Sequence, residues 1–237
     1  MLTAAIYISV ISALVIVSGI KRVPGIGILL SIILIGIAFW NQDINFEQMG
    51  FSYPDDWTKT IFLGLLLGGI IQILALILFD PIIEKITKKS VDLTICKSIR
   101  GNWKSLLLFL AFGWIMGGFI EEILFRGFLM VEINKLLGTG TMCLAINVLL
   151  TSLIFGIAHW YQGKSGVLST GLLGAFLGAI FVWNEFNLWL PIFVHGFINT
   201  FGLIFIATGV DRCLRKSIWG SRDNENGTSE TPTEHHR

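Results

Sequence analysis

Charged side chains are scarce in this chain: Asp, Glu, Lys and Arg together make up 14% of its 237 residues. Soluble globular domains carry about 25% charged residues, so this composition argues against a soluble fold. The three cysteines, Cys96, Cys143 and Cys213, are scattered and form no CxxC pair, which argues against a disulfide framework or a cysteine-based metal site. The formal net charge is only +1, so the chain lacks the basic surface with which proteins bind nucleic acids.

Hydrophobic residues fill most of what remains. They make up 54% of the chain, and the mean hydropathy is +0.75. A membrane-spanning helix needs about 20 predominantly apolar residues. The sequence therefore predicts an all-α, polytopic transmembrane helix bundle of about seven to eight spans that enclose a polar cavity. The expected spans cover residues 2–20, 24–40, 59–79, 105–137, 141–160, 167–183 and 188–209. Asp80-Pro81 is expected to end the third of them.

Three regions differ in their polar residues. Residues 1–104 comprise the N-terminal transmembrane helices and a basic loop, residues 105–210 form a transmembrane core, and residues 211–237 are polar and predicted to be a disordered tail. The segment 82–104 is interpreted either as a helix on the membrane surface or as a solvated connection. Its basic residues are Lys85, Lys88, Lys89, Lys97, Arg100 and Lys104. Basic loops alternate along the chain, which predicts an external N-terminus and a cytosolic tail.

Small residues recur at helical spacing in the apolar runs. The pairs are Gly64 and Gly68, Gly113 and Gly117, and Gly174 and Gly178. Such pairs let membrane helices approach closely, and packing within the chain is the expected use.

A run of ionisable residues, Glu121-Glu122-Ile123-Leu124-Phe125-Arg126, lies near the middle of the fourth span. Ionisable residues inside a membrane are costly, and they mark functional sites by default. Glu122 and Arg126 are four residues apart and can pair on one helix face, so we interpret them as a structural pair. That leaves Glu121 without a local partner, and we assign the chemistry to Glu121.

Other polar side chains in the apolar runs are His159, His195 and Asn199, and Asn199 follows His195 by four residues on the same helix face. A carboxylate and a histidine can activate water as a general base, while a histidine and an amide can donate hydrogen bonds to an oxyanion. Alternatively, Glu121, His159 and His195 suit Zn²⁺ with an open water position. The competing interpretation of each is structural: an interfacial histidine, or a polar contact between helices, as we expect for Gln72 and Asn147.

Three motifs carry a resemblance to a known family. Glu121 to Arg126 resembles the EExxxR motif, Phe155 to His159 the FxxxH motif, and His195 to Asn199 the HxxxN motif of the CPBP family (CAAX proteases and bacteriocin-processing enzymes, also called Abi). The three occur in that order, within about residues 113–202.

The resemblance implies an intramembrane endopeptidase whose catalytic core is residues 105–210. Glu121 would be the general base, and His159 would hold or activate the water. His195 and Asn199 would stabilise the oxyanion, with Glu122, Arg126 and Phe155 supporting the site. The family has been described both as metallo- and as glutamate-type proteases, so a zinc cofactor remains an alternative here.

The expected partners are the lipid bilayer and a peptide or protein substrate reached from the membrane, with no nucleic acid. Substrates in this family range from prenylated CAAX proteins to bacteriocins and signalling peptides. The expected location is a bacterial cell membrane. Two other functions remain open on the same helix bundle: a proton-coupled transporter that uses Glu121 and the histidines as a relay, and a non-catalytic immunity protein.

The straight spans contain one conflict. They put His159 near the cytosolic end and His195 towards the outer end, so that one site cannot hold both. We therefore expect irregular backbone inside the membrane, lining a water-filled cavity near Glu121.

Overall fold

The computed structural model describes residues 1–219, whose regular elements are all helices and include no strand. The regular helices are α1 (Leu2–Ile20), α2 (Pro24–Trp40), α3 (Trp57–Leu74), α4 (Asp80–Thr87), α5 (Trp103–Phe112), α6 (Val131–Leu137), α7 (Thr141–Ala158), α8 (Gly163–Trp183), α9 (Trp189–Thr208) and α10 (Val210–Trp219). Wider π-helical segments are η1 (Ala75–Phe79), η3 (Gly113–Glu121) and η4 (Ile123–Met130). Short 3₁₀ turns are η2 (Thr94–Ile99) and η5 (Trp160–Gln162).

The helices form a multi-pass membrane protein. Within residues 1–219, six helices are long and apolar enough to cross a bilayer, and α2 is an apolar helix of 17 residues. The prediction of an all-α membrane bundle is thus confirmed for six spans. A seventh and an eighth span stay a prediction.

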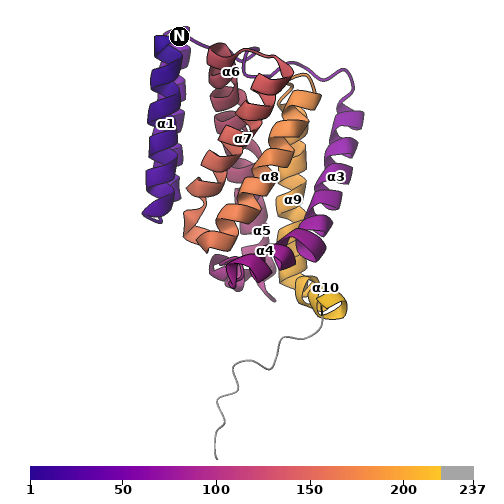
Figure 1. Cartoon of the computed structure of the whole chain (residues 1–237). Coiled ribbons are helices and arrows are strands. Elements are labelled where there is room, and N and C mark those ends of the chain that lie inside the picture. The colour runs from indigo at the N-terminus through magenta and orange to yellow at the C-terminus, as the bar shows by residue number, and fades with distance from the viewer. Residues whose placement is uncertain (220–237) are drawn as a thin grey trace, which may run out of the picture.

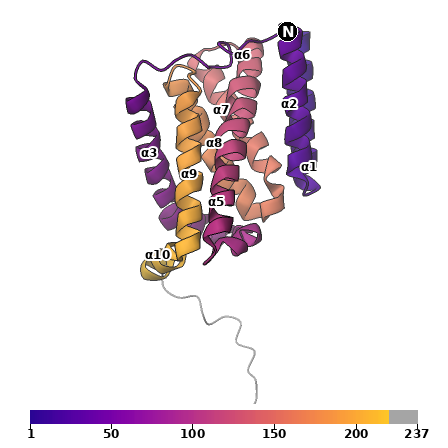
Figure 2. The ribbon, with the colours of Figure 1, turned by 180° about the vertical axis from the view of Figure 1, so that it is seen from behind.

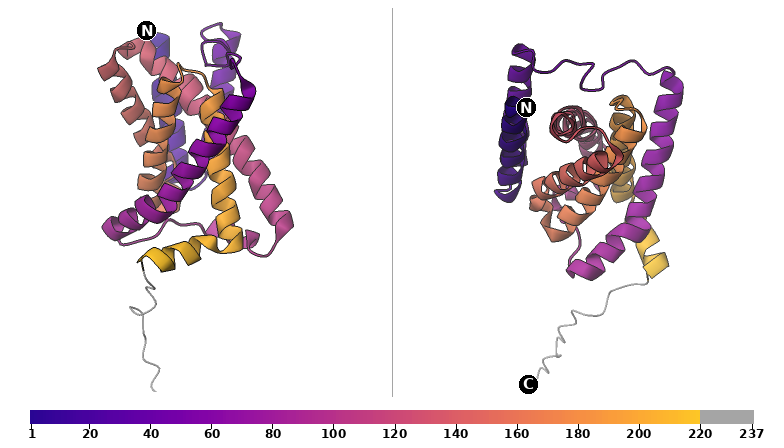
Figure 3. Two further views of the ribbon diagram at one scale, coloured as in Figure 1. Left: turned by 90° about the vertical axis from the view of Figure 1, so that its right-hand side faces the viewer. Right: turned by 45° about the horizontal axis from the view of Figure 1, so that its top comes forward.

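The long helix 103–137, which comprises α5, η3, η4 and α6, runs through the middle of the bundle and carries the Glu121 run. Figures 1 and 2 show α7, α8 and α9 beside this helix, with the α1–α2 pair at one edge and α3 at the other. The loop between α2 and α3 crosses the upper end from one edge to the other (Figure 3). At the lower end, α4 and α10 lie across the bundle.

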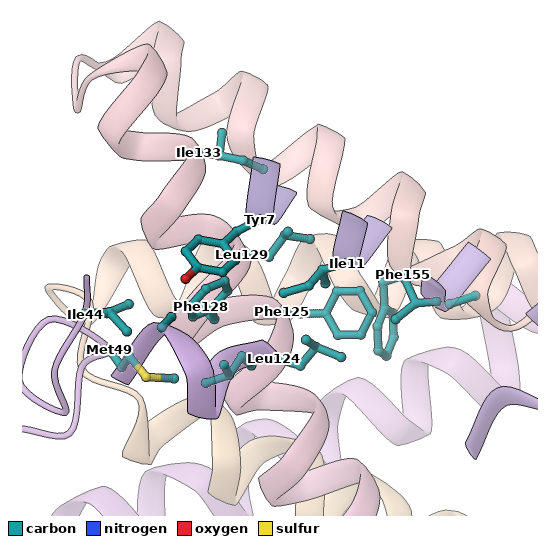
Figure 4. Close-up of a cluster of buried hydrophobic side chains, with 14 residues drawn as sticks. Tyr7, Ile11, Ile44, Met49, Leu124, Phe125, Phe128, Leu129, Ile133 and Phe155 are labelled. Carbon is teal, nitrogen blue, oxygen red and sulfur yellow. The ribbon is translucent and has the colours of Figure 1, made fainter. Parts of the chain in front are cut away.

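A cluster of buried side chains fixes the long helix against α1 and α7 (Figure 4). Tyr7 of α1 meets Phe128 edge-on, with ring centroids 5.6 Å apart. Phe125 meets Phe155 of α7 in the same way at 4.9 Å. Because membrane helices associate through close packing rather than through expulsion of water, these contacts determine which face the long helix turns towards α7.

The prediction that Asp80-Pro81 ends the third span is wrong. The helix continues from α3 through η1 into α4, so that it comprises 31 residues from Trp57 to Thr87. Pro81 lies in the first turn of α4, where a missing N–H is tolerated. The carbonyl of Ile77, four residues before Pro81, accepts instead a hydrogen bond of 2.9 Å from Trp219 Nε1.

Trp219 belongs to α10, which corrects a second prediction. The tail was expected to be disordered from residue 211, but Val210–Trp219 is a helix that contacts α9 and η1 and forms ion pairs with α4. Arg215 Nη1 donates to Glu84 Oε1 at 2.7 Å, and Arg100 lies 3.5 Å from Asp211. These contacts order a polar segment that has no apolar run of its own. The rest of the predicted tail, 220–237, lies outside the described residues.

The predicted glycine pairs do allow close packing. A side chain on Gly64 or Gly68 of α3 would collide with Phe193 or Phe197 of α9. Gly174 and Gly178 of α8 likewise lie against α7, at Phe155 and Val148. The third pair, Gly113 and Gly117, faces the polar residues of α9.

Candidate active site

The backbone around Glu121 is irregular. Glu121 ends η3, and η4 begins two residues later. π-Helical turns widen a helix, re-aim its side chains and often mark functional sites. They also leave carbonyl groups free to accept other donors: Asn199 Nδ2 donates to the Gly113 carbonyl at 2.9 Å. The widened turn thus binds the amide of α9 directly.

Glu121 faces His159, which caps the C-terminus of α7. Glu121 Oε1 and His159 Nε2 are 3.9 Å apart, and their side chains are only 13% and 12% exposed. This separation is too long for a direct hydrogen bond, so a water molecule can contact both atoms.

The tautomer of His159 follows from its other nitrogen. Nδ1 lies 2.8 Å from the Phe155 carbonyl oxygen, which can only accept, so Nδ1 carries the proton. In the neutral imidazole, Nε2 therefore turns a lone pair towards the carboxylate of Glu121. Two acceptors that face each other are suited to a water that donates one hydrogen to each, and this leaves the oxygen's lone pairs free.

Glu122 joins two helices. Its Oε1 accepts from Arg126 Nη1 at 2.8 Å, as the spacing predicted, and it also lies 2.7 Å from His195 Nδ1 of α9. All three side chains are buried, with 0%, 2% and 4% exposed for Glu122, Arg126 and His195. An ionised carboxylate cannot donate, so the proton between His195 and Glu122 belongs to Nδ1. The link to His195 was not predicted from the sequence.

His195 Nε2 and Asn199 Nδ2 converge on Gly117 of the long helix. A Cβ at Gly117 would lie 3.4 Å from His195 Nε2 and would collide with Asn199 Nδ2. The predicted pair thus faces one point beside the Glu121 run. The requirement for glycine at residue 117 was missed, although the Gly113–Gly117 spacing was a signal for close approach.

Phe155 lies between the two groups. Its ring centroid is 4.6 Å from that of His159 and 6.2 Å from that of His195, and the Arg126 guanidinium stacks over it at 5.0 Å. Arg126 also donates to the Gly174 carbonyl of α8 at 2.9 Å. The predicted supporting residues therefore set the spacing between the two histidines.

These contacts bring His159 and His195 to one site, so their expected separation along the membrane normal does not occur. Helix α7 ends at Ala158, and the turn η5 that follows it is bonded to the basic segment: Asp92 N–H donates to the Gln162 carbonyl at 3.1 Å. Tyr161 of this turn, which the sequence did not single out, lies beside His159 with ring centroids 5.6 Å apart and the ring planes tilted by 34°. Gln162 donates to the Tyr161 hydroxyl at 3.2 Å.

The zinc alternative can be tested against this arrangement. Over residues 1–219, no group of three or more His, Cys, Asp or Glu side chains is arranged to hold a metal ion. The predicted ligands Glu121, His159 and His195 do not gather at one point, because Phe155 lies between the histidines. These residues thus do not fit a three-ligand zinc site. Zinc dependence stays a prediction, and no step of the proposed hydrolysis involves zinc.

The predicted role of Asn147 as a contact between helices is confirmed. Its Nδ2 donates to the Met130 carbonyl at 2.8 Å and to Asn134 Oδ1 at 2.7 Å. Gln72 lies against Gly202 of α9, 3.4 Å from a Cβ placed there.

Comparison with known proteins supports the resemblance. Residues 102–201 match the family model described as "Type II CAAX prenyl endopeptidase Rce1-like". The matched segment contains Glu121, His159, His195 and Asn199. Neither the search of curated proteins nor that of solved structures returned a match.

Proposed function

We propose, on the premise that residues 102–201 belong to the Rce1-like type II CAAX prenyl endopeptidase family, a family of membrane proteases, that Glu121 and His159 activate water for peptide hydrolysis. The observation that carries this proposal is the 3.9 Å separation of Glu121 Oε1 and His159 Nε2, with both side chains almost buried. This geometry suits a single water held between two acceptors.

Glu121 acts as the general base. As the water oxygen bonds to the peptide carbonyl carbon, one of its protons passes to Glu121. Glu121 then gives this proton to the leaving nitrogen as the C–N bond breaks. His159 Nε2 accepts the second hydrogen bond of the water and orients its lone pair towards the substrate. A positioned base typically contributes about 10²–10⁴-fold to the rate.

His195 and Asn199 stabilise the oxyanion. Since Nδ1 of His195 donates to Glu122, its Nε2 donates to the oxyanion when the ring carries a proton on both nitrogens. Glu122 orients the ring through Nδ1, and Arg126 holds the carboxylate in place. Asn199 has one further N–H beyond the one donated to Gly113. Loss of one such donor typically costs about 10²–10³-fold in kcat.

We propose that the substrate is a peptide or protein in the bilayer, with prenylated CAAX sequences as the first class to test. Bacteriocins and signalling peptides are the other classes. The end of the bundle that carries α4 and α10 faces the cytosol of a bacterial cell, because the basic residues of segment 82–104 gather there. The N-terminus then lies outside.

The test uses purified protein in phosphatidylcholine liposomes and a fluorescence-quenched peptide that ends in a farnesylated CAAX sequence. Its unprenylated counterpart is the second substrate. Glu121→Gln keeps the size of the side chain and should abolish cleavage. Asp55→Asn, which changes an exposed carboxylate in the loop before α3, should not affect it. Full cleavage by Glu121→Gln would refute the proposed role of Glu121, and no cleavage of either peptide by the wild-type protein would leave the immunity and transporter alternatives to be tested.

A further inference from the structure

A groove of about 520 Å³ lies between α1 and α2, and none of its lining residues belongs to the Glu121 site. The lining comes from both helices and from the turn that joins them, and it is apolar except for two serines and Lys21. The α1–α2 pair stands at the edge of the bundle (Figures 1 and 2), and large apolar side chains of the groove such as Val17 and Ile26 are exposed. The groove therefore opens towards the bilayer.

Small residues leave the hollow between the two helices. Gly27 of α2 lies so close to α1 that a Cβ there would collide with the Ser18 side chain and lie 2.7 Å from the Leu14 carbonyl oxygen. Ala13 contributes only a methyl group to the lining. Ser18 Oγ donates to the Val15 carbonyl at 3.1 Å, so this polar group already has a partner within its own helix. The hollow is therefore suited to a hydrocarbon chain.

The length of the groove matches one leaflet of a bilayer. Its lining on α1 extends from Ser9 to Lys21, twelve residues apart, which is roughly 18 Å of α-helix. One leaflet contributes about half of a hydrocarbon core that is about 30 Å thick. A transmembrane helix of another protein would need a groove along the full thickness, whereas one acyl chain needs only this half.

Lys21 supplies a positive charge at the lower end of the groove. It follows the last residue of α1, it is exposed, and it forms no ion pair within residues 1–219. No carboxylate is among the lining residues. The end of a membrane-spanning helix lies level with the lipid headgroups, where a basic residue attracts anionic lipids.

We propose that this groove binds an anionic phospholipid, with one acyl chain between α1 and α2 and the phosphate beside Lys21. The apolar lining, the length and the unpaired cation together match the two parts of such a molecule. The lipid belongs to the leaflet at the end of the bundle that carries α4 and α10. This site does not depend on the proposed hydrolysis, and its test requires no cleavage.

Two other occupants would use the same hollow. A second copy of the chain would place its own Lys21 against this one in a two-fold contact, because both copies then offer the same surface. The isoprenoid of a prenylated peptide is a hydrocarbon chain, but its thioether carries no charge for Lys21 to bind. The phospholipid alone satisfies both the apolar lining and the cation.

Native mass spectrometry of the purified chain in uncharged detergent tests the site. Phosphatidylglycerol and phosphatidylcholine with the same acyl chains are titrated, and the lipids that stay bound are counted. Ala13→Leu fills the groove, and Lys21→Gln removes its charge. The matched controls are Ala111→Leu and Lys104→Gln, which change exposed residues of α5 outside the groove.

The wild-type protein should retain phosphatidylglycerol in preference to phosphatidylcholine. Ala13→Leu should retain one phosphatidylglycerol fewer than Ala111→Leu. Lys21→Gln should bind that lipid about fivefold more weakly, which is the contribution of about one basic residue at a membrane surface, and Lys104→Gln should bind it as the wild type does.

Four results would overturn the proposal. Equal retention by Ala13→Leu and Ala111→Leu would place the lipid elsewhere, and equal affinity of Lys21→Gln and Lys104→Gln would show that Lys21 does not bind the phosphate. Dimers of the wild type that Ala13→Leu converts to monomers would assign the groove to a second copy. Displacement of one phosphatidylglycerol by a farnesylated peptide from the wild type, but not from Ala13→Leu, would assign it to the isoprenoid.

Discussion

Replacing Glu122 with glutamine keeps the size of the side chain and removes the negative charge that Arg126 and His195 share. Arg126 is 2% exposed and Glu122 is fully buried. A buried ion left without its partner typically costs about 3–5 kcal/mol. Each kcal/mol shifts Tm by roughly 2–4 °C in a chain of this size. Glu122→Gln should therefore lower Tm by roughly 10 °C, and cleavage should fall about 10²–10³-fold through loss of the oxyanion donor.

A double variant separates these two effects. Glu122→Gln with Arg126→Met removes both buried charges and should recover most of the lost Tm. Cleavage should stay low, because His195 still lacks the carboxylate that orients its Nδ1–H. Tm is followed by tryptophan fluorescence of the protein in detergent, and cleavage by the quenched farnesylated peptide in liposomes.

Glu132→Gln is the matched control. Glu132 is also a buried carboxylate of the long helix, but its partner Lys135 is 36% exposed and lies away from both histidines. We expect it to leave cleavage unchanged. If the double variant recovers cleavage together with Tm, His195 does not depend on Glu122 and the proposed coupling is wrong.

Three further predictions concern the packing at Gly117, the helix α10 and zinc dependence. Gly117→Ala should reduce the cleavage rate at least tenfold, which corresponds to about 1.4 kcal/mol, because its Cβ would displace Asn199. Gly25→Ala is the control, since residue 25 has open space around it, and it should leave the rate unchanged. Equal cleavage rates in the two variants would contradict the role of Gly117. Trp219→Phe removes the hydrogen bond to the Ile77 carbonyl and should lower the free energy of unfolding by about 1 kcal/mol. The change is measured as a shift of Tm, with Trp103→Phe at an exposed tryptophan as the control. Equal Tm values in the two variants would show that the hydrogen bond does not stabilise the protein. A zinc chelator should leave the cleavage rate unchanged if Glu121 and His159 alone activate the water. If the chelator abolishes cleavage and added Zn²⁺ restores it, the metal alternative is supported instead.

Hydropathy and local spacing determined much of the architecture. Apolar runs predicted the bounds of α1 and α2, at residues 2–20 and 24–40, because backbone groups in an apolar surrounding must bond within their own helix. The i,i+4 spacing of Glu122 and Arg126 predicted their ion pair for a similar reason: neighbours on one helix face meet wherever the helix lies.

The same local reasoning was wrong where a distant segment completes the structure. Proline ends a helix when its lost hydrogen bond is left unreplaced, but Trp219 satisfies the carbonyl four residues before Pro81. The helix therefore continues, and the segment 210–219 is ordered by contacts that lie 131 and 142 residues away along the chain. The local sequence around one partner of such a contact does not indicate which residue the other partner is.

Within the site, the sequence by itself determined which residue types are present and which of them share a helix face. Only the tertiary structure decided that Glu122 bonds to His195, 73 residues away, and that the carbonyl of Phe155 leaves His159 Nε2 facing Glu121. The physical reason is that the tautomer of a histidine and the partner of a buried carboxylate depend on which acceptor and donor a neighbouring helix brings within about 3 Å, and helix packing decides that distance.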